Sequence, residues 1–174
     1  NVSITTPALT ALLEREIPVT FHSHSGWFRG MAHGVGHRNV EVRTAQYRMS
    51  FDEAACLRFA KELIAAKIAN QRTILRRNWR GPPEERQAVL DRLTAARKSA
   101  EGAGSAAQLL GIEGDAASVY FRALAGLFRP PADRREAGEL APFRFESRNR
   151  RPPTDPVNAM LSLAYAMLTR HLTI

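Results

Sequence analysis

Apolar and polar positions alternate in two different ways along this chain of 174 residues. Residues 3–16 place leucines and alanines at helical spacing around Pro7, which predicts a short amphipathic helix. Residues 17–21 alternate in the manner of a strand, and residues 40–43 do so again after a glycine-rich break. We therefore predict a β-containing first section with strands at 17–21 and 40–43.

From Asp52 onward the apolar period is that of an α-helix. Asp52 is a suitable N-cap for a long helix that reaches about Asn78, with an apolar stripe on one face. A glycine and two prolines end that helix, and residues 84–101 form the next one. The middle of the chain is therefore predicted to be helical.

Two further helices follow in the second half. Gly111 is expected to break the chain, so that Glu113 lies in the first turn of a helix that ends near Phe128. Asp155 as N-cap and Pro156 as first residue begin the last helix, so we interpret Asp155 as a cap and not as a catalytic acid. Its apolar face comprises Val157, Met160, Leu161, Ala164, Tyr165 and Leu168.

These patterns predict an α+β fold in two parts. Residues 1–50 are the end of a small N-terminal β domain, and residues 51–174 are a mainly α-helical C-terminal domain. The apolar period of the last helix runs to Ile174 without a terminating residue, and the chain does not begin with Met. We therefore expect a fragment that lacks both ends, with the helical domain truncated at its C-terminus.

The charge of the chain favours an anionic partner. Lys and Arg number 25 against 17 for Asp and Glu, a formal net charge of +8. Nucleic acid is favoured over a membrane because no long apolar run is present. The basic run in the long helix is either a solvated face or a phosphate-binding one. The candidate DNA-binding residues are Lys67, Arg72, Arg76 and Arg77 there, and Arg148, Arg150 and Arg151 in the 129–155 connection.

Other features narrow the class of protein. The single cysteine excludes a disulfide framework, and no leader or membrane-spanning pattern is seen, so we expect a cytoplasmic protein. Four histidines fall in the β-containing section, but no cysteine is near them and no His pair lies on a convincing helix. We interpret these histidines as polar residues of a strand edge and a loop.

Glu113 is the candidate for chemistry. It lies beside the apolar stripe formed by Ile112, Ala116 and Val119, and small residues follow it, so a metal ion or a phosphate could approach closely. The alternative is a first-turn glutamate that stabilises the positive end of its helix by about 0.3–1 kcal/mol. The residues alone leave both interpretations open.

Two stretches together resemble a known family. Residues 111–117 through Tyr120 and Phe121, then residues 150–159 through Ser162 and Tyr165, are similar in order and spacing to the signature stretches of the CRISPR-associated spacer-acquisition integrases, the Cas-one (Cas1) family. Supporting similarity is found in residues 1–6, 17–26, 45–48 and 67–72. The resemblance covers nearly the whole chain.

The resemblance implies a homodimer, a small partner of the Cas-two (Cas2) family, and a metal-dependent DNA endonuclease/integrase that inserts spacers into a CRISPR array for antiviral defence. It implies that Glu113 is a catalytic ligand of Mg²⁺ or Mn²⁺, acting on duplex DNA with 3′-hydroxyl ends. The family's other ligands, a His and an Asp, follow the last helix, beyond Ile174. His171 falls too early to be one of them.

Two other functions remain open at this stage. Because two of the family's ligands lie outside the chain, the fragment could be a non-catalytic DNA-binding and dimerisation module. Alternatively, its basic faces could dock an acidic partner protein, and competition by DNA would distinguish the two.

Overall fold

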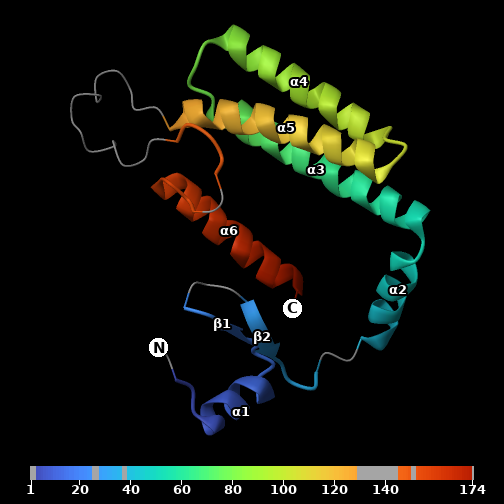
Figure 1. Ribbon diagram of the computed structural model, residues 1–174, viewed down its shortest axis with the longest axis vertical. Helices are drawn as coiled ribbons and strands as arrows, with labels where there is room; N and C mark the ends of the chain where they lie inside the picture. Colours follow the sequence, from blue (N-terminus) through green and yellow to red (C-terminus); the bar gives the residue numbers. More distant parts are fainter. Residues whose placement is uncertain (1–2, 25–27, 37–38, 129–144, 150–151, 174) are drawn as a thin grey trace, which may run out of the picture. The chain divides into compact units, whose positions relative to one another are not determined.

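The computed structural model describes residues 3–24, 28–36, 39–128, 145–149 and 152–173. In order, its elements are α1 (Thr6–Glu14), β1 (Val19–His22), β2 (Phe28–Ala32), α2 (Val40–Ser50), α3 (Glu53–Asn78), α4 (Pro83–Glu101), α5 (Ala106–Leu127) and α6 (Pro156–Thr173) (Figure 1). The chain divides into two compact units, Asn1–Phe51 and Asp52–Thr173. The α+β class is confirmed, with the sheet in the first unit and helices forming the second.

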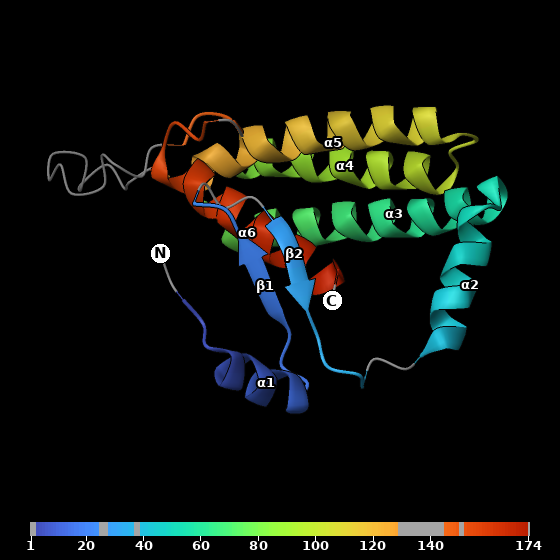
Figure 2. The same cartoon turned by 60° about the horizontal axis from the view of Figure 1, so that its bottom comes forward.

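In the first unit, β1 and β2 form an antiparallel pair (Figure 2). Val19 lies opposite Ala32 and Phe21 opposite Gly30, with an irregularity between Phe21 and His22. Helix α1 begins at the cap Thr5 and contacts β1. A Cβ on the buried Gly34 would lie 2.2 Å from the Leu13 carbonyl oxygen, so only glycine allows the chain after β2 to approach the end of α1 this closely.

The strand predicted at residues 40–43 is wrong. These residues begin α2, because the Asn39 side chain accepts a hydrogen bond from the Val42 backbone N–H at 3.1 Å. Val40 and Val42 are exposed, so their alternation with polar residues did not mark a buried sheet face. The true second strand, Phe28–Ala32, lies closer to β1 in sequence.

In the second unit, α3, α4 and α5 pack pairwise around one core. The long helix was predicted with its correct cap, since Asp52 Oδ1 accepts from the Ala55 N–H at 2.9 Å. The core is formed by Ile68 and Leu75 of α3, Leu90, Leu93 and Ala100 of α4, Ala103 of the connection, and Leu109, Ala116 and Val119 of α5. The predicted apolar stripes of these helices therefore do face one another.

The predicted break at Gly111 is wrong. Helix α5 runs without interruption from Ala106, and its cap is Ser105, whose hydroxyl accepts from the Gln108 N–H at 3.2 Å. Gly111 is exposed with open space around it, and a single glycine in a helix costs only about 1 kcal/mol. Glu113 consequently lies in the third turn, so the first-turn interpretation of its charge does not hold.

Helix α6 begins as predicted, with Asp155 as cap and Pro156 first. A smaller apolar cluster of Leu124, Phe145 and Val157 joins its first turns to α5 and to the segment before α6. The rest of the predicted apolar face is mostly outside this cluster, since Met160, Tyr165 and Leu168 are exposed. Among the described residues, the apolar side chains of α6 pack against other parts of the chain mainly near the start of the helix.

Candidate functional site

Glu113 lies at the edge of the helical core and is paired with a lysine from another helix. Lys67 of α3 donates from Nζ to Glu113 Oε1 of α5 at 2.5 Å. The pair forms because α3 and α5 pack directly against each other, with Ile68 and Ala116 in their shared core. The side chains keep 38% and 24% of their exposure, so both charged groups remain within reach of solvent.

The carboxylate of Glu113 fits one ligand position of a divalent cation. Carboxylate oxygen is a hard donor of the kind Mg²⁺ and Mn²⁺ prefer. A Cβ built at the neighbouring Gly114 would meet nothing within 4 Å, so Gly114 itself faces open space. Across the described residues, no group of three or more His, Cys, Asp or Glu side chains is placed to hold a metal. Glu113 is therefore one donor, not a complete site.

The other carboxylate of this stretch lies apart from Glu113. Asp115 is two residues further along α5, which turns its side chain to a different face of the helix. Its exposed carboxylate contacts Arg92 of α4 at 3.6 Å. The two acids of the Glu-Gly-Asp sequence thus have separate surroundings.

The candidate basic residues of α3 do not all face the same way. Lys67 is engaged by Glu113, and Arg72 donates from Nε to the Leu90 carbonyl of α4 at 3.3 Å. Arg76 and Arg77 are exposed at the C-terminal end of the helix. Ten residues separate Lys67 from Arg77, or about 15 Å along the helix axis. Arg76 and Arg77 are therefore the members of this group most open to a phosphate.

Arg148, another candidate, is held inside the chain. Its Nη1 donates to Asn158 Oδ1 at 2.8 Å and also to the Asn149 carbonyl, while its Nη2 donates to Ser162 Oγ at 3.2 Å. Its guanidinium lies 5.7 Å from the centroid of the Tyr165 ring. Arg150 and Arg151 lie outside the described residues.

Asn158 is the centre of this network. It is fully buried, and it accepts from the Asn149 N–H at 3.0 Å and donates from Nδ2 to the Ser147 carbonyl at 2.9 Å. Its Nδ2 also donates to Asp155 Oδ2 at 2.5 Å. A buried amide needs hydrogen-bond partners, and the structure supplies several for Asn158.

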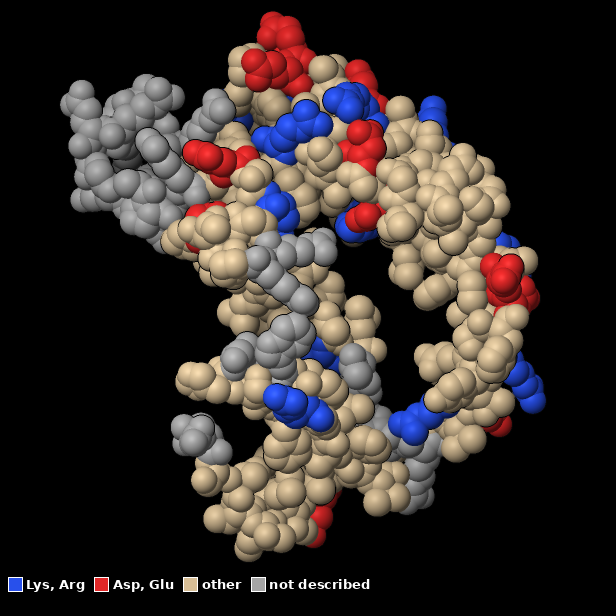
Figure 3. All heavy atoms as spheres, viewed as in Figure 1, with Lys and Arg blue, Asp and Glu red and all other residues tan. Residues whose placement is uncertain are grey.

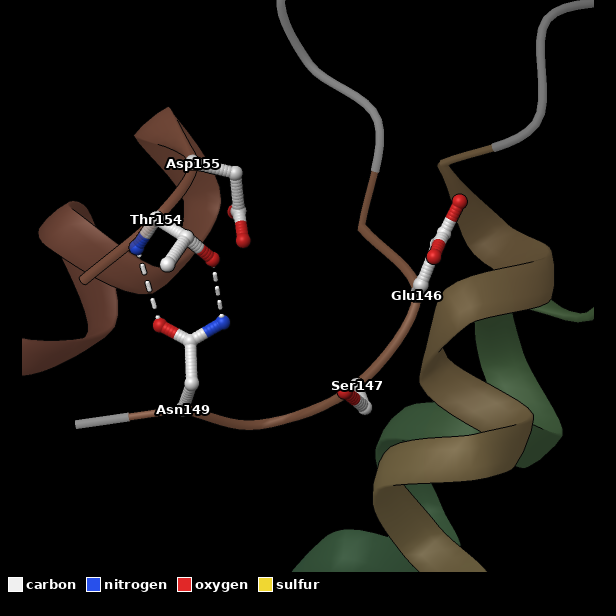
Figure 4. A pocket seen from close by; sticks show the side chains of 5 residues that line it. All are labelled: Glu146, Ser147, Asn149, Thr154 and Asp155. Carbon is white, nitrogen blue, oxygen red and sulfur yellow. Dashed lines mark hydrogen bonds between the residues drawn. The ribbon is translucent and has the colours of Figure 1, made fainter.

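Asn149 and Thr154 close the segment before α6 with a pair of hydrogen bonds. Thr154 N–H donates to Asn149 Oδ1 at 2.9 Å, and Asn149 Nδ2 donates to Thr154 Oγ1 at 2.7 Å (Figure 4). Together with Glu146, Ser147 and Asp155 they line a small polar pocket. Asp155 serves here as a cap, as predicted.

Two ionisable groups of this region have displaced pKa values. Desolvation alone raises the pKa of the Asp155 carboxyl, but hydrogen bonds from Asn158, Asn149 and Val157 outweigh it and hold the pKa below its usual value. Burial raises the pKa of Tyr120 on α5, and the neighbouring Tyr165 of α6 adds to this. Tyr120 therefore stays a neutral hydroxyl well above physiological pH.

Sequence reasoning made Glu113 a candidate but did not predict its contact with Lys67. Lys67 was a candidate for phosphate binding, whereas the structure pairs it with Glu113 across 46 positions of sequence. Similarly, the internal contacts of Arg148 depend on Asn158 and Ser162 of α6. No local pattern signals such pairings, because they depend on how separate helices pack.

Comparison with known proteins identifies related chains. The family model "CRISPR associated protein Cas1" matches residues 1–173. The chain is 54% identical over 172 residues to a CRISPR-associated exonuclease Cas4/endonuclease Cas1 fusion of Rhodospirillum rubrum, covering 99% of this chain and 29% of the fusion. It is 37% identical to a CRISPR-associated endonuclease Cas1 of Thermus thermophilus, covering 97% of this chain and 46% of that protein.

A solved structure is similar as well. A chain of a Cas6-RT-Cas1–Cas2 complex superposes with a TM-score of 0.70 at 30% identity, covering 96% of this chain and 17% of that one. The present chain therefore spans less than half the length of each of these relatives.

Proposed function

The chain belongs to the CRISPR-associated Cas1 family, and we propose that the complete protein is a metal-dependent DNA endonuclease/integrase that inserts new spacers into a CRISPR array. The observation that carries this proposal within the chain is Glu113, a partly exposed carboxylate at the edge of a helical core. The names of the relatives, an endonuclease and a Cas1–Cas2 complex, support the same role.

The chemistry of integration explains why a carboxylate belongs here. Attack of a DNA 3′-hydroxyl on a phosphodiester forms one P–O bond, breaks another with release of that strand's 3′-oxygen, and builds negative charge on the phosphate. A bound Mg²⁺ or Mn²⁺ would stabilise that charge and lower the pKa of the attacking oxygen. Glu113 supplies one oxygen ligand in this proposal. Following the family resemblance, a His and an Asp from sequence after α6 supply others.

Basic residues complete the proposal by holding DNA without reading its sequence. Exposed arginines such as Arg76 and Arg77 contact phosphates, which carry no sequence information, and this suits an enzyme that must accept varied spacers. We further propose that the protein acts in the cytoplasm as a homodimer with a Cas2 partner. None of the helices described in the structure is both long and apolar enough to cross a membrane.

The first prediction concerns Glu113 in the complete protein. Glu113→Gln keeps the size of the side chain but removes the ligand charge, so strand transfer of a 3′-hydroxyl duplex should fall by more than the roughly 10- to 100-fold seen when an outer metal-site partner is lost. Binding to duplex DNA should change little. The measurement is strand transfer into a supercoiled target across a titration of Mg²⁺ or Mn²⁺, with Cas2 present.

Asp115→Asn is the matched control, because Asp115 lies on the same helix and its exposed carboxylate contacts Arg92 instead of Lys67. This variant should integrate normally. Undiminished integration by Glu113→Gln would remove the catalytic assignment.

A second candidate function follows if Glu113 is the only metal ligand that the described residues supply. Because the described residues contain no group of three or more His, Cys, Asp or Glu placed to hold a metal, the 174-residue chain by itself is proposed to bind and dimerise but not to catalyse strand transfer. Metal-dependent strand transfer by the isolated chain would contradict this candidate.

A further inference from the structure

The Lys67–Glu113 pair differs from the other ion pairs among the described residues. Arg97 and Glu101 are neighbours on one helix, and Arg92 and Asp115 meet at 3.6 Å with more than half of each side chain exposed. Lys67 and Glu113 come from different helices, meet at 2.5 Å, and are the least exposed of the three pairs. Their contact therefore depends on the core packing of α3 against α5.

A close lysine has a direct consequence for a carboxylate that must bind a cation. The ammonium group donates to Oε1, one of the two oxygens through which Glu113 could hold a metal. An ammonium and a dication on the same carboxylate would repel each other at short range, and partial burial weakens the screening of that repulsion. The two cations are therefore competitors for Glu113.

A lysine ammonium group can move away from its carboxylate partner and bind another anion. Its charge is a compact group on a flexible four-carbon stem, unlike the rigid planar fork of arginine. The side chain of Lys67 retains 38% exposure, so a path to solvent exists on its own side of the pair. Once displaced, the ammonium has three donors to satisfy, and a DNA phosphate next to Glu113 is the anion that the proposed reaction brings there.

We propose that Lys67 is an internal counter-ion of Glu113 that a divalent cation displaces, and that the released ammonium then binds a phosphate of the DNA substrate. This rests on the proposed function, in which Glu113 is a metal ligand. Metal binding and DNA binding are thereby coupled through one side chain. By linkage, each must strengthen the other by the same factor.

The test uses Lys67→Gln in the complete protein, with Mn²⁺ as the probe. Without DNA, isothermal titration calorimetry should show tighter Mn²⁺ binding by Lys67→Gln than by the wild type, because the competing ammonium is gone. In the wild type, Mn²⁺ should tighten binding of a 3′-dideoxy duplex, measured by fluorescence anisotropy, by a factor within the usual coupling range of about 5–150-fold. In Lys67→Gln that factor should fall toward one.

Two matched variants separate the local effect from a general loss of charge. Lys61→Gln removes the same charge from the same helix, but six residues turn its side chain by about 240° away from Lys67. Its Mn²⁺ affinity and coupling factor should equal those of the wild type. Lys67→Arg keeps the competing charge, so its Mn²⁺ affinity should not rise above that of the wild type.

The outcomes distinguish this inference from the function on which it rests. If Glu113→Gln loses Mn²⁺ binding while Lys67→Gln binds Mn²⁺ no more tightly than the wild type, the counter-ion role is wrong and the ligand role stands. An equal rise in Mn²⁺ affinity in Lys61→Gln would also overturn the counter-ion role. If Glu113→Gln binds Mn²⁺ as the wild type does, the ligand assignment itself fails.

Discussion

At the scale of single residues, Asn158 shows how one buried amide can organise a charged segment. Its oxygen accepts from Arg148 and from the Asn149 backbone, and its nitrogen donates to Ser147 and Asp155. A buried polar group is costly only when it lacks partners, and here each of these groups would lose one hydrogen bond without the Asn158 side chain. Asn158 therefore fastens the segment before α6 to the helix itself.

Asn158→Ala should accordingly destabilise the chain by about 1–3 kcal/mol, the usual cost of leaving a buried donor or acceptor unpaired. Urea unfolding followed by circular dichroism gives the change in free energy, and amide exchange should show faster opening of the first turns of α6. Ser162→Ala, which removes only one contact to Arg148, should cost about 1 kcal/mol or less. An equal loss of unfolding free energy in the two variants would contradict the proposal that Asn158 is the centre of this hydrogen-bond network.

At the scale of elements, the caps decide where each helix begins. Ser105 starts α5 well before Glu113, which places that carboxylate opposite α3 and not at a helix end. Asp155 starts α6, and its carboxylate also binds the Asn158 side chain. The geometry of both candidate regions thus depends on the cap residue at which the helix begins.

The cap of α6 predicts a pH dependence. The pKa of Asp155 is lower in the folded chain than its ordinary value of 3.8, so the folded state binds this proton more weakly than the unfolded state. The stabilisation is complete above the ordinary pKa and is lost as the pH falls through the folded value. Asp155→Asn, which keeps a good N-cap, should flatten this acid-side loss when thermal unfolding is compared at pH 3 to 6. Identical profiles for the two proteins would argue against the contribution of Asp155.

At the scale of the whole molecule, the net charge of +8 does not by itself show where the basic side chains lie. On the face shown in Figure 3, acidic and basic side chains are interspersed over the unit that contains α3, α4 and α5. Several basic groups are already engaged within the chain, among them Lys67, Arg72 and Arg148. We therefore expect the exposed Arg76 and Arg77 to contribute more to the proposed DNA binding than the total charge suggests.

Replacing both Arg76 and Arg77 by Gln should weaken duplex binding and reduce the slope of log affinity against log salt by about two, since each phosphate contact contributes about 0.9. Fluorescence anisotropy between 50 and 200 mM salt, a range over which such contacts change affinity strongly, measures this slope. Arg97→Gln removes an exposed arginine that is paired with Glu101 and should leave the slope unchanged. A slope that is the same in all three proteins would place the DNA on another surface.

The sequence by itself determined the features that depend on local chemistry. Caps at Asp52 and Asp155 and the 3.6-residue apolar stripes gave the long helices and their buried faces, and the strand at 17–21 was near its true position. The α+β class followed from these elements, and the Cas1 family followed from the resemblance of residues 111–121 and 150–165 to its signature stretches. It misjudged residues 40–43 and Gly111, where short patterns are ambiguous and the caps Asn39 and Ser105 prevailed.

Only the tertiary structure decided which charged groups meet. Lys67 and Glu113 are 46 positions apart, and Arg148 reaches Asn158 and Ser162 from a segment with no regular period. A periodic pattern tells which face of a helix is buried, but it does not tell which neighbour covers that face or which side chains lie at its edge. Those contacts follow from the packing of α3 on α5 and of the segment before α6 on α6, because packing alone sets distances between residues remote in sequence.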